Sequence, residues 1–170
     1  MNIRLLLTGF ATLCLMVSCT PSKEKMQAEI DGLEAIVLDQ GDTSHRQELL
    51  ACYDRFVQKH PEDSLAPEYL FRKAEVLRIG KEGDAALDVM AELVSRYPES
   101  PRVAECYFLR GLVYEEVFYD QDKAKKAYLS FIERYPEHPL AEDARYAIRY
   151  LGLSAEEIIA SFEAKQPVEE

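Results

Sequence analysis

The sequence predicts an all-α fold, a solenoid of antiparallel helix hairpins, from three observations. An aromatic residue or His is followed by Pro and Glu three times, at residues 60–62, 97–99 and 135–137, so the spacing is 37 and then 38 residues. A fixed period of this size is typical of one supersecondary unit stacked on copies of itself. Each interval holds two stretches with helical periodicity, and no stretch shows the alternating pattern of a strand.

The second interval shows the hairpin most clearly. Its first helix is expected over residues 104–114, where Tyr107, Gly111 and Tyr114 recur at i, i+4 and i+7. Its second helix is expected over residues 123–135. The apolar stripe of this second helix consists of Ala124, Tyr128, Phe131 and Tyr135. A mid-helix glycine costs about 1 kcal/mol relative to Ala. Gly111 therefore indicates a close approach of the partner helix.

The first interval repeats this pattern, which predicts repeat units over residues 62–98 and 99–136. Shifts of 37 and 38 residues superpose the two stripes on a matching set: Leu70, Ala74, Leu77, Ala86, Met90 and Leu93. Residues 45–60 repeat only the second helix and residues 139–151 only the first, so half units are expected before and after. Four polar residues are expected at helix starts, and these are Asp84, Ser100, Asp122 and His138.

The ends of the helical domain, predicted over residues 26–163, have their own signals. Residues 154–162 are expected to form a short closing helix, with Ser154 as N-cap and Glu157 completing a capping box. Residues 164–170 are expected to form a disordered tail.

An apolar stripe near the N-terminus leaves two readings open. Met26, Ile30, Leu33 and Val37 keep helical spacing over about two heptads. The stripe predicts either a helix packed on the first half unit or a short coiled coil. The second reading would make the protein an oligomeric spacer.

The first 25 residues predict secretion and lipidation. Arg4 precedes an apolar run too short for the roughly 20 residues of a spanning helix, so residues 1–18 are predicted to be a signal peptide. Residues 15–19 resemble a bacterial lipoprotein processing site, which implies a lipid on Cys19 and a tether over residues 19–25. Thr20 then implies the outer membrane, and we expect the protein to face the periplasm. The alternative is an ordinary cleaved signal with a chance cysteine.

Composition argues against several functions. Without residues 1–18 the chain has 19 Lys and Arg against 31 Asp and Glu, a net charge of −12. Nucleic-acid binding needs a clustered basic surface, so we expect no nucleic-acid partner. The histidines and cysteines lack metal-ligand spacing, so we expect no metal, no cofactor and no enzyme activity. Cys52 and Cys106 lie a whole repeat apart and are expected to be unpaired core residues.

The order of large, small and aromatic residues in the first helix, and of Ala, aromatic, apolar residue and Pro in the second, resembles the tetratricopeptide repeat. The resemblance covers residues 62–136 and implies a right-handed solenoid whose first helices, the A helices, line a concave groove. Removing the core stripe from these helices leaves the residues expected to face a protein or peptide partner. They are Glu68, Phe71, Glu75, Arg78, Glu105, Phe108, Leu112, Glu115, Glu142, Arg145 and Arg149. Phe71 and Phe108 are expected to be apolar anchors, or alternatively to pack between neighbouring A helices.

With the lipidation signal, these repeats resemble the tetratricopeptide lipoproteins of the outer-membrane β-barrel assembly machinery. The resemblance implies an adaptor or scaffold that binds envelope proteins and is a monomer outside its complex. The alternative is the oligomeric coiled-coil spacer, of a kind that coordinates envelope constriction.

Overall fold

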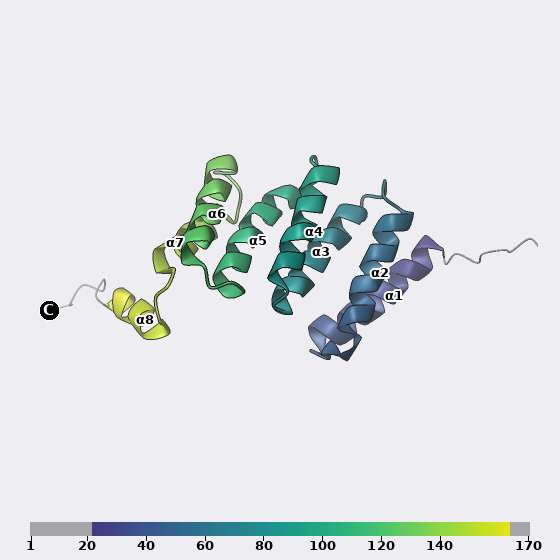
Figure 1. Cartoon of the computed structure of the whole chain (residues 1–170), viewed down its shortest axis with the longest axis horizontal. Coiled ribbons are helices and arrows are strands. Elements are labelled where there is room, and N and C mark those ends of the chain that lie inside the picture. The colour runs from purple at the N-terminus through teal and green to yellow at the C-terminus, as the bar shows by residue number, and fades with distance from the viewer. Residues whose placement is uncertain (1–21, 164–170) are drawn as a thin grey trace, which may run out of the picture.

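The computed structural model describes residues 22–163, and over that range the protein is all-α (Figure 1). The helices are α1 (Lys23–Glu34), α2 (Arg46–Lys59), α3 (Ala66–Ile79), α4 (Gly83–Arg96), α5 (Arg102–Glu116), α6 (Gln121–Arg134), α7 (Ala141–Tyr150) and α8 (Ala155–Glu163). They pack as sequential antiparallel pairs along a row, with α1 and α8 at opposite ends (Figure 1). The predicted fold class is confirmed.

The first hairpin confirms one of the two predicted readings, a helix packed on the first half unit, but its start differs from the prediction. Helix α1 begins at Lys23, inside the expected tether, because Ser22 caps it and accepts a hydrogen bond from the backbone N–H of Lys25. A π-helical turn over Ala35–Asp39 extends α1 before the chain reaches α2. The apolar stripe is at most 7% exposed and is packed in one core with α2; it consists of Met26, Ile30, Leu33 and Val37. Because the stripe of α1 is covered by α2, the helix packed on the first half unit completes a hairpin with it, and no apolar seam is left free for the alternative coiled coil.

The predicted signal peptide, the lipidation site Cys19 and the first residues of the tether lie outside the described residues. The predicted tail over residues 164–170 lies outside them as well. Within residues 22–163, none of the helices has the length and apolar character needed to cross a membrane.

The three Pro-containing connections between hairpins share one backbone arrangement. In each, the aromatic residue or His accepts a hydrogen bond through its carbonyl oxygen. The donor is the backbone N–H of the residue three positions later, at 3.0–3.1 Å. The side chain of the same donor residue accepts a hydrogen bond from the N–H two positions further on. Asp63, Ser100 and His138 fill this position, at 2.9, 3.2 and 3.2 Å. Three chemically different side chains serve alike because each supplies an acceptor atom close to the backbone.

Helix starts correct two predicted caps. Asp84 and Asp122 lie inside the first turns of α4 and α6, not before them. Asp120 caps α6 and accepts a hydrogen bond from the N–H of Lys123 at 3.0 Å. At α8 the predicted capping box is confirmed. The N–H of Glu157 donates to Ser154 Oγ at 3.2 Å, and the N–H of Ser154 donates to the Glu157 carboxylate at 2.7 Å.

The contact between α5 and α6 confirms the reason given for Gly111. A Cβ atom on Gly111 would lie 2.2 Å from the ring of Tyr128, so only glycine lets the helices approach this closely. The predicted stripe of α5 is partly wrong, because Tyr107 and Tyr114 are only half-buried. The most buried side chains of α5 are Cys106, Leu109 and Val113. Helix α5 packs against α3, α4 and α6, so its buried surface is wider than one stripe.

Candidate protein-binding face

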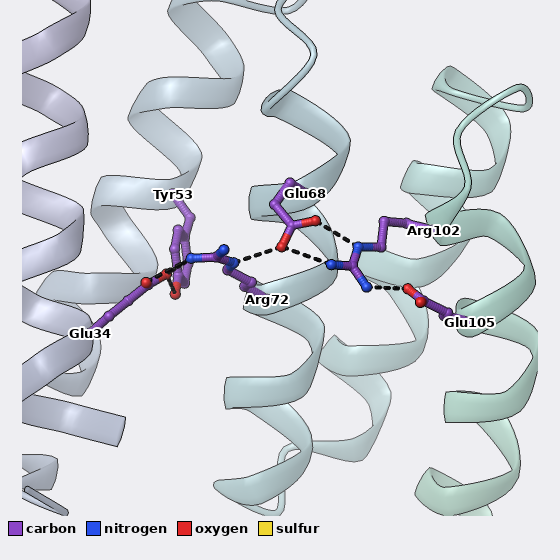
Figure 2. A network of polar contacts seen from close by, with 6 residues as sticks. All are labelled: Glu34, Tyr53, Glu68, Arg72, Arg102 and Glu105. Carbon is purple, nitrogen blue, oxygen red and sulfur yellow. Dashed lines mark hydrogen bonds and ion pairs between the residues drawn. The ribbon is translucent and has the colours of Figure 1, made fainter. Parts of the chain in front are cut away.

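Charged side chains link the first helices of three successive hairpins. Helices α1, α3 and α5 lie side by side, and Figure 2 shows five residues of alternating charge running across them. We define the A face as the surface carrying these five residues, Glu34, Glu68, Arg72, Arg102 and Glu105. The row starts at the end of α1 and reaches the second turn of α3 and the first turn of α5.

The geometry of the A face is a continuous series of ion pairs. Arg72 donates through Nη1 to both carboxylate oxygens of Glu34, at 2.7 and 2.9 Å, and through Nε to Glu68 at 2.8 Å. Arg102 donates through Nε to the other oxygen of Glu68 at 2.6 Å and also pairs with Glu105. Glu68 therefore accepts from two arginines on different helices. The series fixes the register of the three helices by charge-assisted hydrogen bonds.

A tyrosine from the neighbouring layer secures one end of this series. The hydroxyl of Tyr53 in α2 donates to Glu34 at 2.6 Å (Figure 2). Burial, followed by the hydrogen bond to Glu34, raises the pKa of Tyr53 well above its ordinary value. The hydroxyl is therefore a neutral donor throughout the physiological pH range. The hairpin of α5 and α6 has an equivalent, because Tyr128 donates to Glu115 at 2.7 Å.

Glu68 shows which electrostatic effect dominates at the A face. Its side chain is 18% exposed, and burial acts to raise its pKa. Burial is the largest single effect, but the hydrogen bonds and charges of Arg102 and Arg72 together outweigh it, so the pKa of Glu68 lies below its ordinary value. The carboxylate is therefore ionised at neutral pH and bound to two cations.

Most charged residues of the predicted groove already have an intramolecular partner. Glu68 and Glu105 belong to the ion-pair series, Arg78 pairs with Glu116, and Glu115 accepts from Tyr128. These contacts place them between hairpins or within one. Nearer the C-terminal end, Glu142 and Arg145 form an exposed pair at 3.0 Å, and the Arg149 guanidinium lies 5.4 Å from the ring of Tyr146.

The apolar anchors of the predicted groove are half-buried. Phe71 packs against the larger core, and the Arg102 guanidinium from the next A helix covers its ring at 4.8 Å. Phe108 contacts Tyr128 and Phe131, with ring centroids at 5.6 and 5.7 Å, so it packs within its own hairpin. Leu112 joins the two core clusters. Each keeps some exposed surface, and their contact with a partner stays a prediction.

Glu75 differs from the other acidic groove residues. Its carboxylate makes no hydrogen bond or ion pair to any residue of the described chain. Burial raises its pKa, and the nearby Arg78 and Arg102 only partly oppose this effect. A partly buried carboxylate without a donor is a ready acceptor for a cationic or N–H group of a partner.

Four residues of the A face and its support were not anticipated: Glu34, Tyr53, Arg72 and Arg102. One pairing had a detectable signal, because Glu68 and Arg72 are spaced i, i+4, which places them on the same face of a helix. The pairs that cross between helices connect residues 34 to 38 positions apart, and local spacing does not reveal them.

No cluster of three or more potential metal ligands occurs between residues 22 and 163. Cys52 and Cys106 are buried thiols, and burial raises their pKa values to about 11 and about 12. Neither thiol is therefore poised as a nucleophile.

Comparison with known families supports the repeat interpretation. A family model described as "Tetratricopeptide repeat" matches residues 105–138. The match runs from the first turn of α5 through α6 and into the third Pro-containing connection. A search of curated proteins finds no match to the chain. A tetratricopeptide repeat implies protein partners in general, and proteins with such repeats are usually non-catalytic binding scaffolds.

Proposed function

We propose that this chain is a protein-binding adaptor of the bacterial cell envelope, anchored to the outer membrane by a lipid on Cys19. The repeat match over residues 105–138 supports the binding role. The resemblance of residues 15–19 to a lipoprotein processing site supports the anchor. The observation that carries the proposal is the A face, where one series of ion pairs holds three helices in register (Figure 2).

A face held in register is suited to binding because little order has to be created when a partner docks. Most charged groups of the A face are already paired with one another. They therefore stabilise the arrangement of the helices and are not free to bind a partner. Recognition falls to the half-exposed Phe71 and Leu112 and to the unpaired Glu75. An apolar anchor beside an acceptor fits a partner segment that carries an apolar side chain next to a Lys or Arg.

Outer-membrane protein assembly is the first envelope pathway to test, because the repeats and the lipidation signal together resemble the lipoproteins of that machinery. Depletion of the protein should then lower the amount of folded barrel proteins in the outer membrane. Unchanged barrel-protein levels after depletion would remove this pathway and leave the adaptor role to be tested by itself.

Affinity capture from a detergent extract of the envelope tests the binding role. The full-length protein is compared with a Phe71→Ala plus Glu75→Gln variant and with a matched Leu129→Ala control. Leu129 is 48% exposed on α6, away from the A face. The wild type and the control should retain the same partner, and the A-face variant should lose most of it. Retention of the same protein in equal amount by all three would reject the A face as the binding surface.

A Cys19→Ser variant tests the anchor. Labelled palmitate should enter the wild-type protein and not the variant, and only the wild type should sediment with the outer membrane. If both proteins are unlabelled and soluble, the N-terminal segment is an ordinary cleaved signal and the anchor is rejected.

A further inference from the structure

A cleft lies on the side of α5 that faces away from the A face. Helix α5 is flanked by α4 and α6 in Figure 1, and Tyr107, Arg110 and Tyr114 of α5 line the space on both sides of it. The space next to α4 has a volume of about 490 Å³ and the space next to α6 about 190 Å³. We call these two adjoining spaces, which share the three α5 residues, the α5 cleft. On a helix of 3.6 residues per turn, its three floor residues are opposite Glu105 and Leu112 of the predicted groove.

Two arginines at or beside the α5 cleft have no carboxylate partner within residues 22–163. Arg110 lines the cleft, whereas Arg134 lies at its α6 edge, in an adjoining space lined by Ser130 and Glu133. The guanidinium groups of Arg110 and Arg134 lie 5.8 and 4.9 Å from the ring centre of the same residue, Tyr107. Of the arginines in the described chain, these two and Arg149 form no ion pair with a carboxylate. In a chain with net charge −11, two unpaired guanidinium groups on one ring are a marked local exception.

The preceding repeat shows what is missing around Arg110. Thirty-seven residues earlier stands Lys73, whose ammonium group pairs with Asp54 of α2. The same shift carries Asp54 to Ala91 of α4, and Ala91 lines the α5 cleft. The cation is thus retained between repeats while its carboxylate is replaced by a methyl group.

Arg134 likewise lacks the carboxylate that its counterpart in the preceding repeat has. Thirty-eight residues earlier stands Arg96, which pairs with Glu92 one turn before it in α4. The same shift carries Glu92 to Ser130, which lines the α6 side of the cleft. Ala91 and Ser130 therefore both stand where the preceding repeat has a carboxylate, and both lie at the α5 cleft.

The remaining lining residues define the chemistry of an occupant. Lys123 and Lys126 add positive charge on the α6 side, although Lys123 pairs with Asp120. On the α4 side the lining is mainly apolar, with Leu87, Met90 and Val94. Asp88 also lines this side and makes no ion pair within residues 22–163.

We infer that the α5 cleft binds an extended acidic segment of a partner protein. The carboxylates of this partner segment pair with Arg110 and Arg134, as Asp54 and Glu92 pair with Lys73 and Arg96 in the preceding repeat. Alternate side chains of an extended chain point in opposite directions, so an acidic residue can face the guanidinium groups while its neighbour packs on the apolar wall of α4. The stacked Tyr107 ring holds both guanidinium groups in place before binding.

Fluorescence anisotropy with a labelled octapeptide, Ser-Glu-Leu-Glu-Leu-Glu-Leu-Ser, tests this inference on the mature protein in detergent. The control probe has Gln in place of each Glu. The acidic probe should bind about tenfold more tightly than the Gln probe, and added salt should weaken it selectively. Equal affinities for the two probes would overturn the proposal.

The sharpest variant restores the missing partners inside the chain. Ala91 and Ser130 are exposed, so Ala91→Asp plus Ser130→Glu should fold normally. The new carboxylates should pair with Arg110 and Arg134 and lower the affinity for the acidic probe to that of the Gln probe. An Arg110→Gln plus Arg134→Gln variant should show the same loss. If neither variant changes acidic-probe binding, the cleft is not the site.

Two controls separate this surface from others. Lys73→Gln plus Arg96→Gln removes the equivalent cations of the preceding repeat, which are already paired, and should leave probe affinity unchanged. Phe71→Ala plus Glu75→Gln, on the A face, should do the same, so failure of one binding surface is distinguishable from failure of the other. Tighter probe binding after Glu169→Gln plus Glu170→Gln would show that the chain's own acidic end fills the cleft, and this result would overturn a partner as the occupant.

Discussion

The hydroxyl of Tyr97 donates a hydrogen bond of 2.9 Å to the carbonyl oxygen of Pro61. The two residues lie in successive Pro-containing connections, so this bond ties one hairpin boundary to the next. Burial raises the pKa of Tyr97, and the hydroxyl therefore keeps its proton. Interfaces between neighbouring repeats supply much of the stability of a solenoid, and this bond is one such interface contact.

Tyr97→Phe should lower the free energy of unfolding by about 1 kcal/mol, because it leaves the Pro61 carbonyl without its donor and changes little else. Urea denaturation followed by circular dichroism measures the effect. Tyr135→Phe is the matched control, since within residues 22–163 the Tyr135 hydroxyl makes no hydrogen bond. Equal losses in both variants would show that the hydrogen bond to Pro61 is not the cause of the effect.

Gly111→Ala should destabilise the protein by about 2 kcal/mol although Ala is the better helix former. The added methyl group would lie 2.2 Å from the Tyr128 ring, and the packed contact between α5 and α6 would have to open. Gly32→Ala in α1 is the control, because apart from its chain neighbours and the backbone of its own helix no atom lies within 4 Å of its added methyl group. That variant should gain about 1 kcal/mol from helix propensity alone. A stabilised Gly111→Ala would contradict the close helix contact.

The repeat architecture could be predicted from the sequence because its signals are local and recur. The Pro-containing connections, the small residue in the first helix and the capping box of α8 each act over a few residues. For the first hairpin the sequence left two readings open, and its place in the repeat was not recognised for a physical reason. Its helices are joined through a π-helical turn and a longer connection, so α1 is out of phase with the period of 37 residues.

The candidate sites were harder to predict because they depend on pairings between helices. Spacing placed Glu68 and Glu105 on one face, but it could not show that Arg102 joins them. Likewise, the loss of a carboxylate at Ala91 becomes meaningful only once Lys73 is seen to pair with Asp54. Sequence periodicity defines which residues share a helix face, while the partner across the interface depends on the packed structure.

Glu68→Gln should destabilise the protein by about 1–2 kcal/mol at neutral pH, since it removes the charge shared by Arg72 and Arg102. The pKa of Glu68 is lowered in the folded state. Its stabilising effect is therefore present above the ordinary value of 4.5 and is lost as the pH falls through the lower folded-state pKa. Thermal unfolding from pH 7 to pH 3 should show the two proteins converging at acid pH.

Glu142→Gln is the control for this experiment. Glu142 pairs with Arg145 on the surface, and its side chain is 60% exposed, so its loss should cost under about 0.5 kcal/mol. If Glu68→Gln and Glu142→Gln are equally mild, the A-face ion pairs do not hold the helices in register.

Glu75→Gln should have the opposite effect and raise the free energy of unfolding by about 1 kcal/mol at pH 7. Glu75 is partly buried without a donor, and this burial raises its pKa. Because the folded protein binds the proton more tightly than the unfolded chain, protonation stabilises the fold as the pH falls toward 4.5. Above the folded-state pKa the ionised carboxylate carries its desolvation cost, which the neutral amide avoids.

The advantage of Glu75→Gln should therefore disappear as the pH approaches 4.5, and thermal unfolding across pH 4–8 measures it. Glu133→Gln, an exposed position on α6, should leave stability unchanged over the whole range. The same Glu75→Gln variant should bind the A-face partner less tightly, because the unpaired acceptor is gone. A gain in stability together with a loss of binding is the signature of a residue kept for recognition, whereas a loss of stability would show that Glu75 has a structural partner in solution.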